Sequence, residues 1–503
     1  MELQTLIKNL DYEIISENNK NEISDIEIDS RKTSDKCVFV AMVGAKFDAH
    51  DYIGKSYENG CRTFVIQHDF ENMDEYKKDS TIIKVNDARK ALSYMSMEYF
   101  DHPEKKIKTI AITGTKGKTT TTFMIKAVLE KAGIKTGIIG TTGIYIGEEF
   151  IVNPNTTPES YKIMKYMDMM AKNDIKVCVI EVSSQAFKLS RVAGVEFDYG
   201  IFTNMSPDHI GENEHKDYEE YRFCKSMLFK QCKVGLFNID DKEAEYMMKS
   251  ATCDKVTFGF NKNADYHADN IEYVRRDGFI GMGFDLHGKL EKHFVINTPG
   301  EFSIYNAMAA ISVLEFFDVS YDDLEYGLSN TFVKGRVESV KISDKFTLLI
   351  DYAHNAMSVE SVLSTIRKYN PKRMVSLFGC GGNRSKLRRY EMGEMSGKLA
   401  DLSVITADNS RDEDVMDIIE DIKVGINKTD GEYVVIPDRK EAIKYCIENA
   451  KEGDIILLLG KGHEDYQEIK GVKYPFDERV IIKEIMEELK NAWFWINWWK
   501  KNI

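Results

Sequence analysis

The strongest constraint on the fold of this chain is an apolar run that leads through a glycine-rich loop into a helical pattern. The run covers residues 107–112, the loop reads Thr113-Gly-Thr-Lys-Gly-Lys-Thr-Thr120, and the spacing predicts a helix over about 118–132. A strand, a glycine turn, a lysine and a threonine at a helix start form a cradle for polyphosphate. Lys118 would reach the outer phosphates, and the Thr119 hydroxyl would ligate Mg²⁺. We therefore expect ATP or GTP to bind at Gly114, Thr115, Lys116, Gly117, Lys118, Thr119 and Thr120.

The loop is a short form of the phosphate-binding pattern. Ile112 stands five residues before Gly117, where the strict pattern has a glycine. A tight glycine turn that carries a surface lysine is the alternative interpretation. The strand before the loop and the helix after it favour nucleotide binding.

Strand-like runs alternate with helical patterns along the chain, which predicts an α/β fold with doubly wound parallel sheets and three domains. Residues 1–105 form a smaller N-terminal α/β domain, with runs at 24–28, 37–42, 62–67 and 81–85 and a helix over 88–100. A central domain over 106–336 adds runs at 177–182, 199–203 and 233–238, antiparallel alternation over 255–297 and a helix over 303–317. Runs at 347–352, 374–378, 402–406, 433–436 and 454–459 predict a Rossmann-like C-terminal domain over 337–490.

Charge and composition exclude several classes of protein. The net charge of −14 argues against a nucleic-acid binder with a broad basic face. Apolar runs fall far short of the ~20 residues of a membrane span, and the N-terminus lacks the pattern of a secretory signal. The eight cysteines are scattered without a CxxC pair, which is typical of free thiols in a reducing compartment. We expect a monomeric cytoplasmic protein with no nucleic-acid partner and no membrane span.

A tail over residues 491–503 holds all four tryptophans. One interpretation is a hydrophobic strap that packs on the C-terminal domain. The other is an anchor at a surface or a membrane interface.

Two polar residues follow neighbouring apolar runs in the central domain. Glu181 ends one run and His209 lies just beyond the next. The carboxyl ends of parallel strands meet at one edge of a sheet, so these residues predict a cation site beside the phosphate loop. The alternatives are a structural carboxylate at Glu181 and a loop histidine at His209. Lys225 lies among apolar neighbours on a helical pattern, and composition alone indicates a surface lysine.

Several separated motifs together point to one family. They are Asp29-Ser-Arg31 with Phe39-Val-Ala41 and Gly44, the loop Gly114–Thr120, Asn155-Thr-Thr-Pro158, Glu181-Val-Ser-Ser184, Phe202-Thr-Asn204 with Asp208-His209, Gly300-Glu-Phe302 with Asn306, Gly335-Arg336 with Glu338, Asp351-Tyr-Ala-His-Asn355, Phe378-Gly-Cys-Gly-Gly-Asn-Arg384, Asp408-Asn-Ser-Arg411 and Gly460-Lys-Gly-His-Glu464. On these motifs the chain resembles the Mur ligases nearly from end to end. It is most similar to those that add the third amino acid to UDP-N-acetylmuramoyl-L-alanyl-D-glutamate.

The resemblance implies a role for each matching residue. Ser30 would contact the uridine diphosphate, and the muramoyl-peptide would be held by Asn155, Thr156, Thr157, Ser183 and Arg191. The nucleotide would also be served by Asn306, Arg336, Asp351 and His354. Catalysis would depend on Lys118, Glu181, His209 and Lys225, and Mg²⁺ would be held by Thr119, Glu181, His209 and Lys225.

Lys225 matches the lysine that the family carries as a carbamate. Formation of N6-carboxylysine from CO₂ needs a neutral amine, and an unperturbed lysine is neutral only ~0.04% of the time at pH 7. Burial among apolar side chains would lower the pKa of Lys225, and Mg²⁺ would then hold the carbamate.

The implied reaction is ATP-driven amide formation through an acyl phosphate, in cytoplasmic synthesis of peptidoglycan precursors. UDP-N-acetylmuramoyl-dipeptide and a diamino acid are the expected substrates, with ATP, Mg²⁺ and CO₂. Arg384 and Arg411 would clamp a carboxylate at the far end of the amino acid, and Glu464 with the Gly460 backbone would receive the distal ammonium. This arrangement favours meso-diaminopimelate over L-lysine, which together with other diamino acids stays open. The remaining residues of the predicted pocket are Asp408, Asn409 and Ser410.

The chain departs from the family pattern at four positions. Where the family usually has a histidine, an aspartate and a proline, this chain has Gln185, Asn383 and Ser410. The fourth position is Ala356, near which the family often has a proline. None of these changes removes a group that the chemistry requires, but Ser410 lies inside the predicted amino-acid pocket.

Two other functions remain as alternatives. One is another Mur step or a folylpoly-γ-glutamate synthetase, and the segments 29–31 and 408–411 count against the folate enzyme. The other is an inactive nucleotide-binding scaffold anchored through the tail. A scaffold has no need for four converging polar groups, and this chain has Lys118, Glu181, His209 and Lys225.

Overall fold

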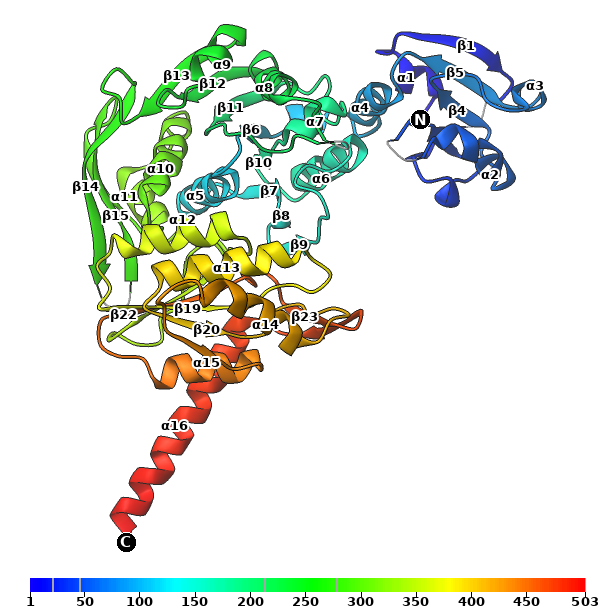
Figure 1. The fold of residues 1–503 in the computed structure, drawn as a ribbon. Coiled ribbons are helices and arrows are strands. Elements are labelled where there is room, and N and C mark those ends of the chain that lie inside the picture. The colour runs from blue at the N-terminus through cyan, green and yellow to red at the C-terminus, as the bar shows by residue number, and fades with distance from the viewer. Residues whose placement is uncertain (20–21, 45–46, 212–213, 277–278, 503) are drawn as a thin grey trace. The chain divides into compact units, whose positions relative to one another are not determined.

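The computed structural model describes residues 1–19, 22–44, 47–211, 214–276 and 279–502 (Figure 1). The side chains of residues 276 and 491–502 lie outside this description, and so do the two interpretations of the tryptophan tail. The chain divides into two compact units, Met1–His267 with Met308–Leu324, and Ala268–Ala307 with Glu325–Ile503. The three-domain division at residues 105 and 336 stays a prediction.

The N-terminal part of the first unit is built on a five-stranded sheet in the order β1-β5-β4-β3-β2. Its strands are β1 (Tyr12–Glu17), β2 (Asp25–Glu27), β3 (Cys37–Val40), β4 (Thr63–Ile66) and β5 (Thr81–Val85). All neighbours are parallel except β1 and β5. Alternate side chains of β3 face two different cores, because Val38 packs with the α4 residues Leu92 and Met95 and Phe39 packs with Ile53 of α2.

Four short helices accompany this sheet: α1 (Leu3–Ile7), α2 (Ile53–Glu58), α3 (Met73–Tyr76) and α4 (Ala88–Tyr99). Asp87 begins α4, because its carboxylate accepts from the backbone N–H groups of Arg89 and Lys90. The predicted strands and the helix are present with ends shifted by one or two residues. The half-exposed edge strand β1 was not predicted.

The central sheet of the first unit contains the phosphate loop. Its strands are β6 (Lys108–Thr113), β7 (Thr136–Gly140), β8 (Gly143–Ile146), β9 (Glu149–Ile151), β10 (Val177–Glu181), β11 (Phe197–Phe202), β12 (Cys232–Asn238) and β13 (Asp254–Gly259). Their order is β13-β12-β11-β6-β10-β7-β8-β9. From β13 to β7 all neighbours are parallel, so the carboxyl ends of these six strands meet at one edge of the sheet.

The parallel strands of this sheet are connected through helices. They are α5 (Lys118–Lys131), α6 (Ser160–Lys172), α7 (Ser184–Lys188), α8 (Tyr218–Ser226) and α9 (Ala244–Ser250). Figure 1 shows them in cyan to green around the sheet. This is the predicted doubly wound arrangement.

The chain then passes between the two units through β14 (Tyr266–Arg276), α10 (Glu301–Leu314) and α11 (Tyr321–Ser329). The second unit includes the antiparallel pair β15 (Phe279–Gly288) and β16 (Lys292–Ile296). This confirms the antiparallel character predicted for 255–297 over its second half, since β12 and β13 are parallel.

The second unit is built mainly on a six-stranded sheet in the order β17-β18-β22-β19-β20-β21. The strands are β17 (Glu338–Ser339), β18 (Thr347–Asp351), β19 (Arg373–Phe378), β20 (Leu402–Ile405), β21 (Tyr433–Val435) and β22 (Asp454–Leu459), and only β17 is antiparallel to its neighbour. The helices are α12 (Ala356–Arg367), α13 (Lys386–Leu399), α14 (Val415–Ile426), α15 (Arg439–Glu448) and α16 (Glu478–Asn502). A hairpin of β23 (Tyr466–Ile469) and β24 (Val472–Pro475), which was not predicted, precedes α16.

The length and hydropathy of the helices bear on membrane insertion. Within the described residues, none combines the length and the apolar character that crossing a bilayer requires.

Candidate functional site

The loop between β6 and α5 has the backbone of a phosphate cradle. Gly114 and Gly117 have φ angles of 149° and 86°, which side chains other than glycine rarely adopt. A Cβ atom on Gly114 would overlap the hydroxyl of Thr203. The backbone of Lys116 is fixed by Asn204, whose amide oxygen accepts from the Lys116 N–H at 2.9 Å. The open N-terminus of α5 therefore faces the loop, with Thr119 and Thr120 in its first turn.

Lys118 and Lys225 meet at this loop. The Nζ atom of Lys118 donates to the carbonyl oxygen of Gly114 at 2.8 Å, and the Nζ atom of Lys225 donates to the same oxygen at 2.9 Å. Lys225 is buried with 2% of its surface exposed, and its ammonium lies 4.7 Å from the centre of the Tyr221 ring. Burial, together with the charge of Lys118, lowers the pKa of Lys225 well below its ordinary value. Composition alone indicated a surface lysine, and the structure corrects this.

The carboxylate of Glu181 lies next to the hydroxyl of Thr119. Glu181 ends β10, is 1% exposed, and both of its oxygens lie 3.0 Å from the hydroxyl of Thr119. Thr141 also donates to it, through its backbone N–H at 3.2 Å and its hydroxyl at 3.0 Å. Sequence reasoning missed Thr141, because the strand before it, β7, was not predicted. The short run Gly137–Ile139 and the glycine that ends β7 are the sequence features that could have indicated this strand.

His209 lies in the loop that follows β11, with its side chain half exposed. Its Nδ1 atom is 2.9 Å from Glu214, and its ring centre is 6.2 Å from that of Tyr221. The Tyr221 hydroxyl is in turn 3.0 Å from the hydroxyl of Thr115 in the phosphate loop. In the described part of the chain, no hydrogen bond or ion pair joins His209 to Glu181 or Lys225. The structure thus brings His209 to the margin of the loop, and its role as a metal ligand stays a prediction.

The residues predicted to hold the muramoyl-peptide gather around the end of β10. The hydroxyl of Thr157 donates to the carbonyl oxygen of Glu181 at 2.9 Å and accepts from the Ser183 N–H at 3.0 Å. Thr156 lies 3.0 Å from the hydroxyl of Thr141, which also contacts Glu181. Arg191 donates to the carbonyl oxygen of Thr157 at 2.9 Å.

Asn155, the remaining member of that set, and Ser30, which was predicted to contact the uridine diphosphate, have other hydrogen-bond partners. Asn155 is exposed, and its carbonyl oxygen accepts from Asn153. Ser30 begins a short 3-10 helix in the N-terminal sheet region, and its carbonyl oxygen accepts from the side chains of Thr33 and Asn59.

The nucleotide residues that were predicted beyond residue 300 belong to the second unit. The carboxylate of Asp351 accepts from the N–H groups of Val337 and Ala353, both at 2.8 Å. Burial raises the pKa of Asp351 although these hydrogen bonds oppose the shift. Arg336 lies 5.8 Å from the ring centre of Tyr352.

The ring of Tyr352 also links His354 to this group, with 4.6 Å between the two ring centres. The Nδ1 atom of His354 lies 2.8 Å from the carbonyl oxygen of Tyr352. Asn306 is buried on α10 of the same unit, 4% exposed.

The predicted amino-acid pocket contains a buried lysine that sequence reasoning did not select. Lys461 is fully buried, and its ammonium lies 3.2 Å from an oxygen of Asp408 and 3.2 Å from an oxygen of Glu464. It also donates to the amide oxygen of Asn409 at 2.6 Å and to the carbonyl oxygen of Tyr466 at 2.7 Å. Lys461 lies between the motif residues Gly460 and Gly462, and this position could have indicated that it belongs to the pocket. One lysine thus connects both acidic residues of the pocket.

Arg384 and Arg411 flank Gly381 on the same side of the second unit. A Cβ atom built on Gly381 would lie 3.2 Å from Nη1 of Arg411 and 3.8 Å from Cγ of Arg384. Arg384 is exposed, while Arg411 donates to the carbonyl oxygen of Gly382 at 2.7 Å and to Glu468 at 3.3 Å. The structure therefore brings together the two arginines that were predicted as a carboxylate clamp.

Ser410, the departure from the usual proline, is 2% exposed, and its carbonyl oxygen would overlap a Cβ atom on Gly382. Gly382 must therefore be a glycine. Asn383, the other departure in this pocket, donates through its side chain to Asp412 at 2.7 Å.

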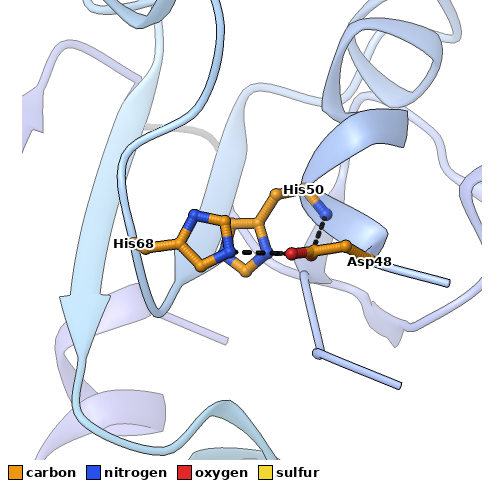
Figure 2. A group of neighbouring side chains, drawn as sticks. All are labelled: Asp48, His50 and His68. Carbon is orange, nitrogen blue, oxygen red and sulfur yellow. Dashed lines mark hydrogen bonds and ion pairs between the residues drawn. The ribbon is translucent and has the colours of Figure 1, made fainter. Parts of the chain in front are cut away.

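Asp48, His50 and His68 form a further polar cluster in the N-terminal sheet region (Figure 2). The two oxygens of Asp48 lie 2.6 Å from Nδ1 of His50 and 2.8 Å from Nε2 of His68. The backbone N–H of Gln67 donates to Nε2 of His50, and Nδ1 of His68 lies 2.9 Å from the carbonyl oxygen of Asp69. The rings stack with 3.8 Å between their centres, so their lone pairs do not converge as those of tetrahedral metal ligands do.

The protonation of this cluster follows from its partners. Because Gln67 donates to His50, the His50 proton lies on Nδ1, and burial lowers the pKa of His50. Both nitrogens of His68 face oxygen acceptors, and these contacts with Asp69 and Asp48 raise the pKa of His68. Burial alone would raise the pKa of Asp48, but hydrogen bonds from the two histidines lower it to about 2.

Comparison with protein families finds three matches along the chain. Residues 22–99 match the Mur ligase family, catalytic domain; residues 112–314 match the Mur ligase middle domain; and residues 335–462 match the Mur ligase, glutamate ligase domain. These segments cover all the site residues described above except Glu464 at the end of its motif.

Comparison with individual proteins finds relatives of nearly the same length. A UDP-N-acetylmuramoyl-L-alanyl-D-glutamate--2,6-diaminopimelate ligase of Clostridium botulinum is 42% identical over 493 residues, 97% of this chain and 100% of the relative. A ligase of the same name from Clostridium perfringens is 40% identical over 97% of this chain and 100% of its own length. A solved structure of a ligase with this name is similar with a TM-score of 0.72 and 26% identity, over 97% of this chain and 99% of that one.

Proposed function

The chain belongs to the Mur ligase family, and on this premise we propose that it joins 2,6-diaminopimelate to UDP-N-acetylmuramoyl-L-alanyl-D-glutamate with hydrolysis of ATP. The reaction forms an amide during synthesis of peptidoglycan precursors. The contact of Lys118 and Lys225 with the same Gly114 oxygen carries the proposal. It joins the phosphate cradle to a buried amine, which a scaffold without catalysis would not need.

The residues of the first unit account for phosphoryl transfer. The side-chain carboxylate of the D-glutamyl residue attacks the γ-phosphorus of ATP, which gives an acyl phosphate and ADP. The carboxylate and the triphosphate repel each other, so Lys118 and the backbone N–H groups at the start of α5 must neutralise the developing charge. The α-amine of the third amino acid then attacks the acyl carbon and expels phosphate.

The oxygens of Thr119 and Glu181 suit a magnesium ion, because Mg²⁺ prefers hydroxyl, carboxylate and phosphate oxygens. The hydrogen bonds from Thr119 to both Glu181 oxygens place two such ligands together, which supports the fit. A bound Mg²⁺ would neutralise charge between the β- and γ-phosphates. His209 and a carbamate on Lys225 are the proposed additional ligands.

Lys225 has the environment that carbamate formation requires. Its amine is buried and its pKa is lowered, so the neutral form that reacts with CO₂ is more populated than in an exposed lysine. The reaction forms a bond between Nζ and the carbon of CO₂, and the nitrogen releases one proton. The product is an anionic side chain next to the phosphate loop.

The pocket of the second unit favours a diamino dicarboxylic acid. Arg384 and Arg411 flank Gly381 and would bind the distal carboxylate, which L-lysine lacks. Glu464 would bind the distal ammonium.

The eight cysteines are all free thiols, which supports the expected cytoplasmic location.

A phosphate-release assay tests the proposed function. Release from ATP should require both UDP-N-acetylmuramoyl-L-alanyl-D-glutamate and an amino acid, and a panel of amino acids should rank diaminopimelate first. Release that needs only one of the two substrates would contradict the ligase. A preference for lysine would retain the ligase and reject the proposed amino acid.

A further inference from the structure

Arg439 is a buried arginine outside all the motifs discussed above. It is the first residue of α15 and is 1% exposed. Its Nη1 atom donates to the carbonyl oxygen of Ala407 at 3.1 Å, and its Nη2 atom donates to the carbonyl oxygen of Leu459 at 2.8 Å. Ala407 directly precedes Asp408, and Leu459 directly precedes Gly460. One guanidinium therefore holds the starts of two of the loops that form the predicted amino-acid pocket.

The two carbonyl groups belong to strand ends that are not neighbours. Strands β20 and β22 both pair with β19 and lie on opposite sides of it. No ladder hydrogen bond therefore joins β20 directly to β22, and the loops that follow them begin beyond the ladders with β19. Arg439 connects them across the end of β19, where the third loop of the pocket begins at Gly379. A Cβ atom on Gly379 would overlap the carbonyl oxygen of Thr406, so the strand ends are closely packed there.

Glu478 fixes the guanidinium in this position. Its Oε1 atom accepts from Nε of Arg439 at 2.9 Å and from Nη2 at 2.8 Å, and both side chains are fully buried. A planar guanidinium held on one edge by a carboxylate directs its remaining N–H groups in a fixed plane. The two carbonyl oxygens accept from those groups. The pair thus has a defined geometry that a lysine could not reproduce.

We propose that Arg439, held by Glu478, is the positioning residue of the amino-acid pocket and sets the separation of the Asp408 and Gly460 loops. This inference rests on the proposed function for the identity of the ligand. Arg439 acts through the backbone and does not itself contact a substrate. Because Asp408 and Glu464 of these loops share Lys461, a change in loop separation disturbs all three charges at once.

A purely structural role is the competing explanation. Removal of one partner of a buried ion pair is strongly destabilising, whereas replacement of both by apolar residues is often neutral. The double variant Arg439→Met/Glu478→Leu therefore separates the two explanations. It removes the buried charges together and also removes the hydrogen bonds to Ala407 and Leu459. Arg439→Lys keeps the charge but loses the planar donors.

The chain offers a matched control at the opposite end of the same sheet. Arg373 begins β19 and donates to Asp454, the first residue of β22, at 2.6 Å. Asp454 is 1% exposed, so this is also a largely buried arginine–aspartate pair. The double variant Arg373→Met/Asp454→Leu disturbs the amino ends of these strands, away from the pocket.

The experiment combines steady-state kinetics with hydrogen exchange on the full chain. For Arg439→Met/Glu478→Leu and for Arg439→Lys we expect the KM for diaminopimelate to rise by about 10- to 100-fold, with the KM values for ATP and the UDP-linked substrate within about twofold of the original. Backbone amides of residues 408–411 and 460–464 should exchange faster in the same variants. The control should change neither the KM for the amino acid nor these exchange rates.

The kinetic and exchange results can overturn the positioning role of Arg439 and the proposed function separately. Unchanged exchange at 408–411 and 460–464 in a folded double variant overturns the positioning role, whatever the activity. A uniform loss of kcat with unchanged KM for the amino acid does so as well. If the original chain shows no turnover on the proposed substrates, the proposed function fails. The exchange measurement still tests the positioning role, because it needs no substrate.

Discussion

Lys118 and Lys225 donate to the same carbonyl oxygen, that of Gly114, at 2.8 Å and 2.9 Å. Two ammonium groups at one oxygen repel each other, and Lys225 is the one that is fully enclosed. Its pKa is lowered by burial first and by the charge of Lys118 second. Lys118 thus makes the amine of Lys225 easier to deprotonate, in addition to the role proposed for Lys118 at the phosphates.

Replacement of Lys225 tests its modification. Lys225→Gln should reduce turnover by at least about 100-fold, because the site loses an anionic group next to the phosphate loop. The intact mass of the original chain, measured under native conditions with bicarbonate, should include one added CO₂ that the variant lacks. Lys216→Gln is the control, since the Lys216 side chain is 73% exposed. A variant that retains full activity without bicarbonate would reject the carbamate.

Replacement of Lys461 tests the charge balance of the predicted amino-acid pocket. Lys461→Met leaves Asp408 and Glu464 without their shared cation, so the free energy of unfolding of the second unit should fall by about 3–5 kcal/mol. Urea denaturation followed by hydrogen exchange in residues 402–466 measures this loss. The exposed Lys451, changed to Met, provides the control. Equal stability of the two variants would show that the buried contacts are not needed.

Replacement of Arg384 tests the carboxylate clamp. Arg384 is exposed, so its removal should not affect folding, whereas Arg411 also holds Gly382 and Glu468. Loss of one charged hydrogen bond costs about 1.5–3 kcal/mol, which corresponds to a rise of roughly 10- to 100-fold in the KM for diaminopimelate. The KM for L-lysine should stay the same, because lysine has no distal carboxylate. Lys386→Ala, an exposed neighbour, should change neither value.

The Asp48–His50–His68 cluster predicts a pH dependence of stability. The pKa of His68 is raised above 6.5, so its contribution is complete below pH 6.5 and is lost as the pH rises through the raised value. The pKa of Asp48 is lowered from 3.8 to about 2, so its contribution is complete above pH 3.8 and is lost as the pH falls toward 2. The pKa of His50 is lowered by burial, which acts in the opposite direction to His68.

The difference between the original chain and His68→Gln reports mainly on His68, because burial, the largest cause of the His50 shift, is common to both. The original chain should have the higher melting temperature. The difference from the variant should be largest between pH 5 and 6.5 and smaller at pH 8 to 9. The effect should be small, since the side chain of His68 is 50% exposed. A difference that grows with pH would contradict the assignment. Thermal denaturation in matched buffers at constant ionic strength measures it.

Local patterns in the sequence were sufficient for the central architecture. The apolar run before Gly114 and the helix after Gly117 are present as predicted, because glycine conformations and helix periodicity depend on a few adjacent residues. The five strands predicted for the Rossmann-like sheet are also present. The edge strand β1 and the β23–β24 hairpin were missed, because half-exposed strands lack a continuous apolar run. The strand β7 was missed although it is fully buried, because two of its five residues are glycines that interrupt the apolar run.

The environment of individual side chains was less predictable. The run around Lys225 is compatible with a surface helix, and only the packing of α8 against the phosphate loop buries its amine beside Gly114. Lys461 was passed over for a similar reason, since the acids that surround it come from two different loops. For His209 the motif predicts a metal ligand, which stays a prediction, and the structure adds that its side chain contacts Glu214 and lies near the ring of Tyr221.

The sequence by itself determined most of the strands and helices, the phosphate loop and the family to which the chain belongs. These features follow from residues close together in the chain. Only the tertiary structure decided which charges are buried and which of them share a partner, as Lys118 and Lys225 share Gly114 and as Ala407 and Leu459 share Arg439. Burial and pKa depend on atoms from distant segments, and their arrangement exists only after the chain has folded.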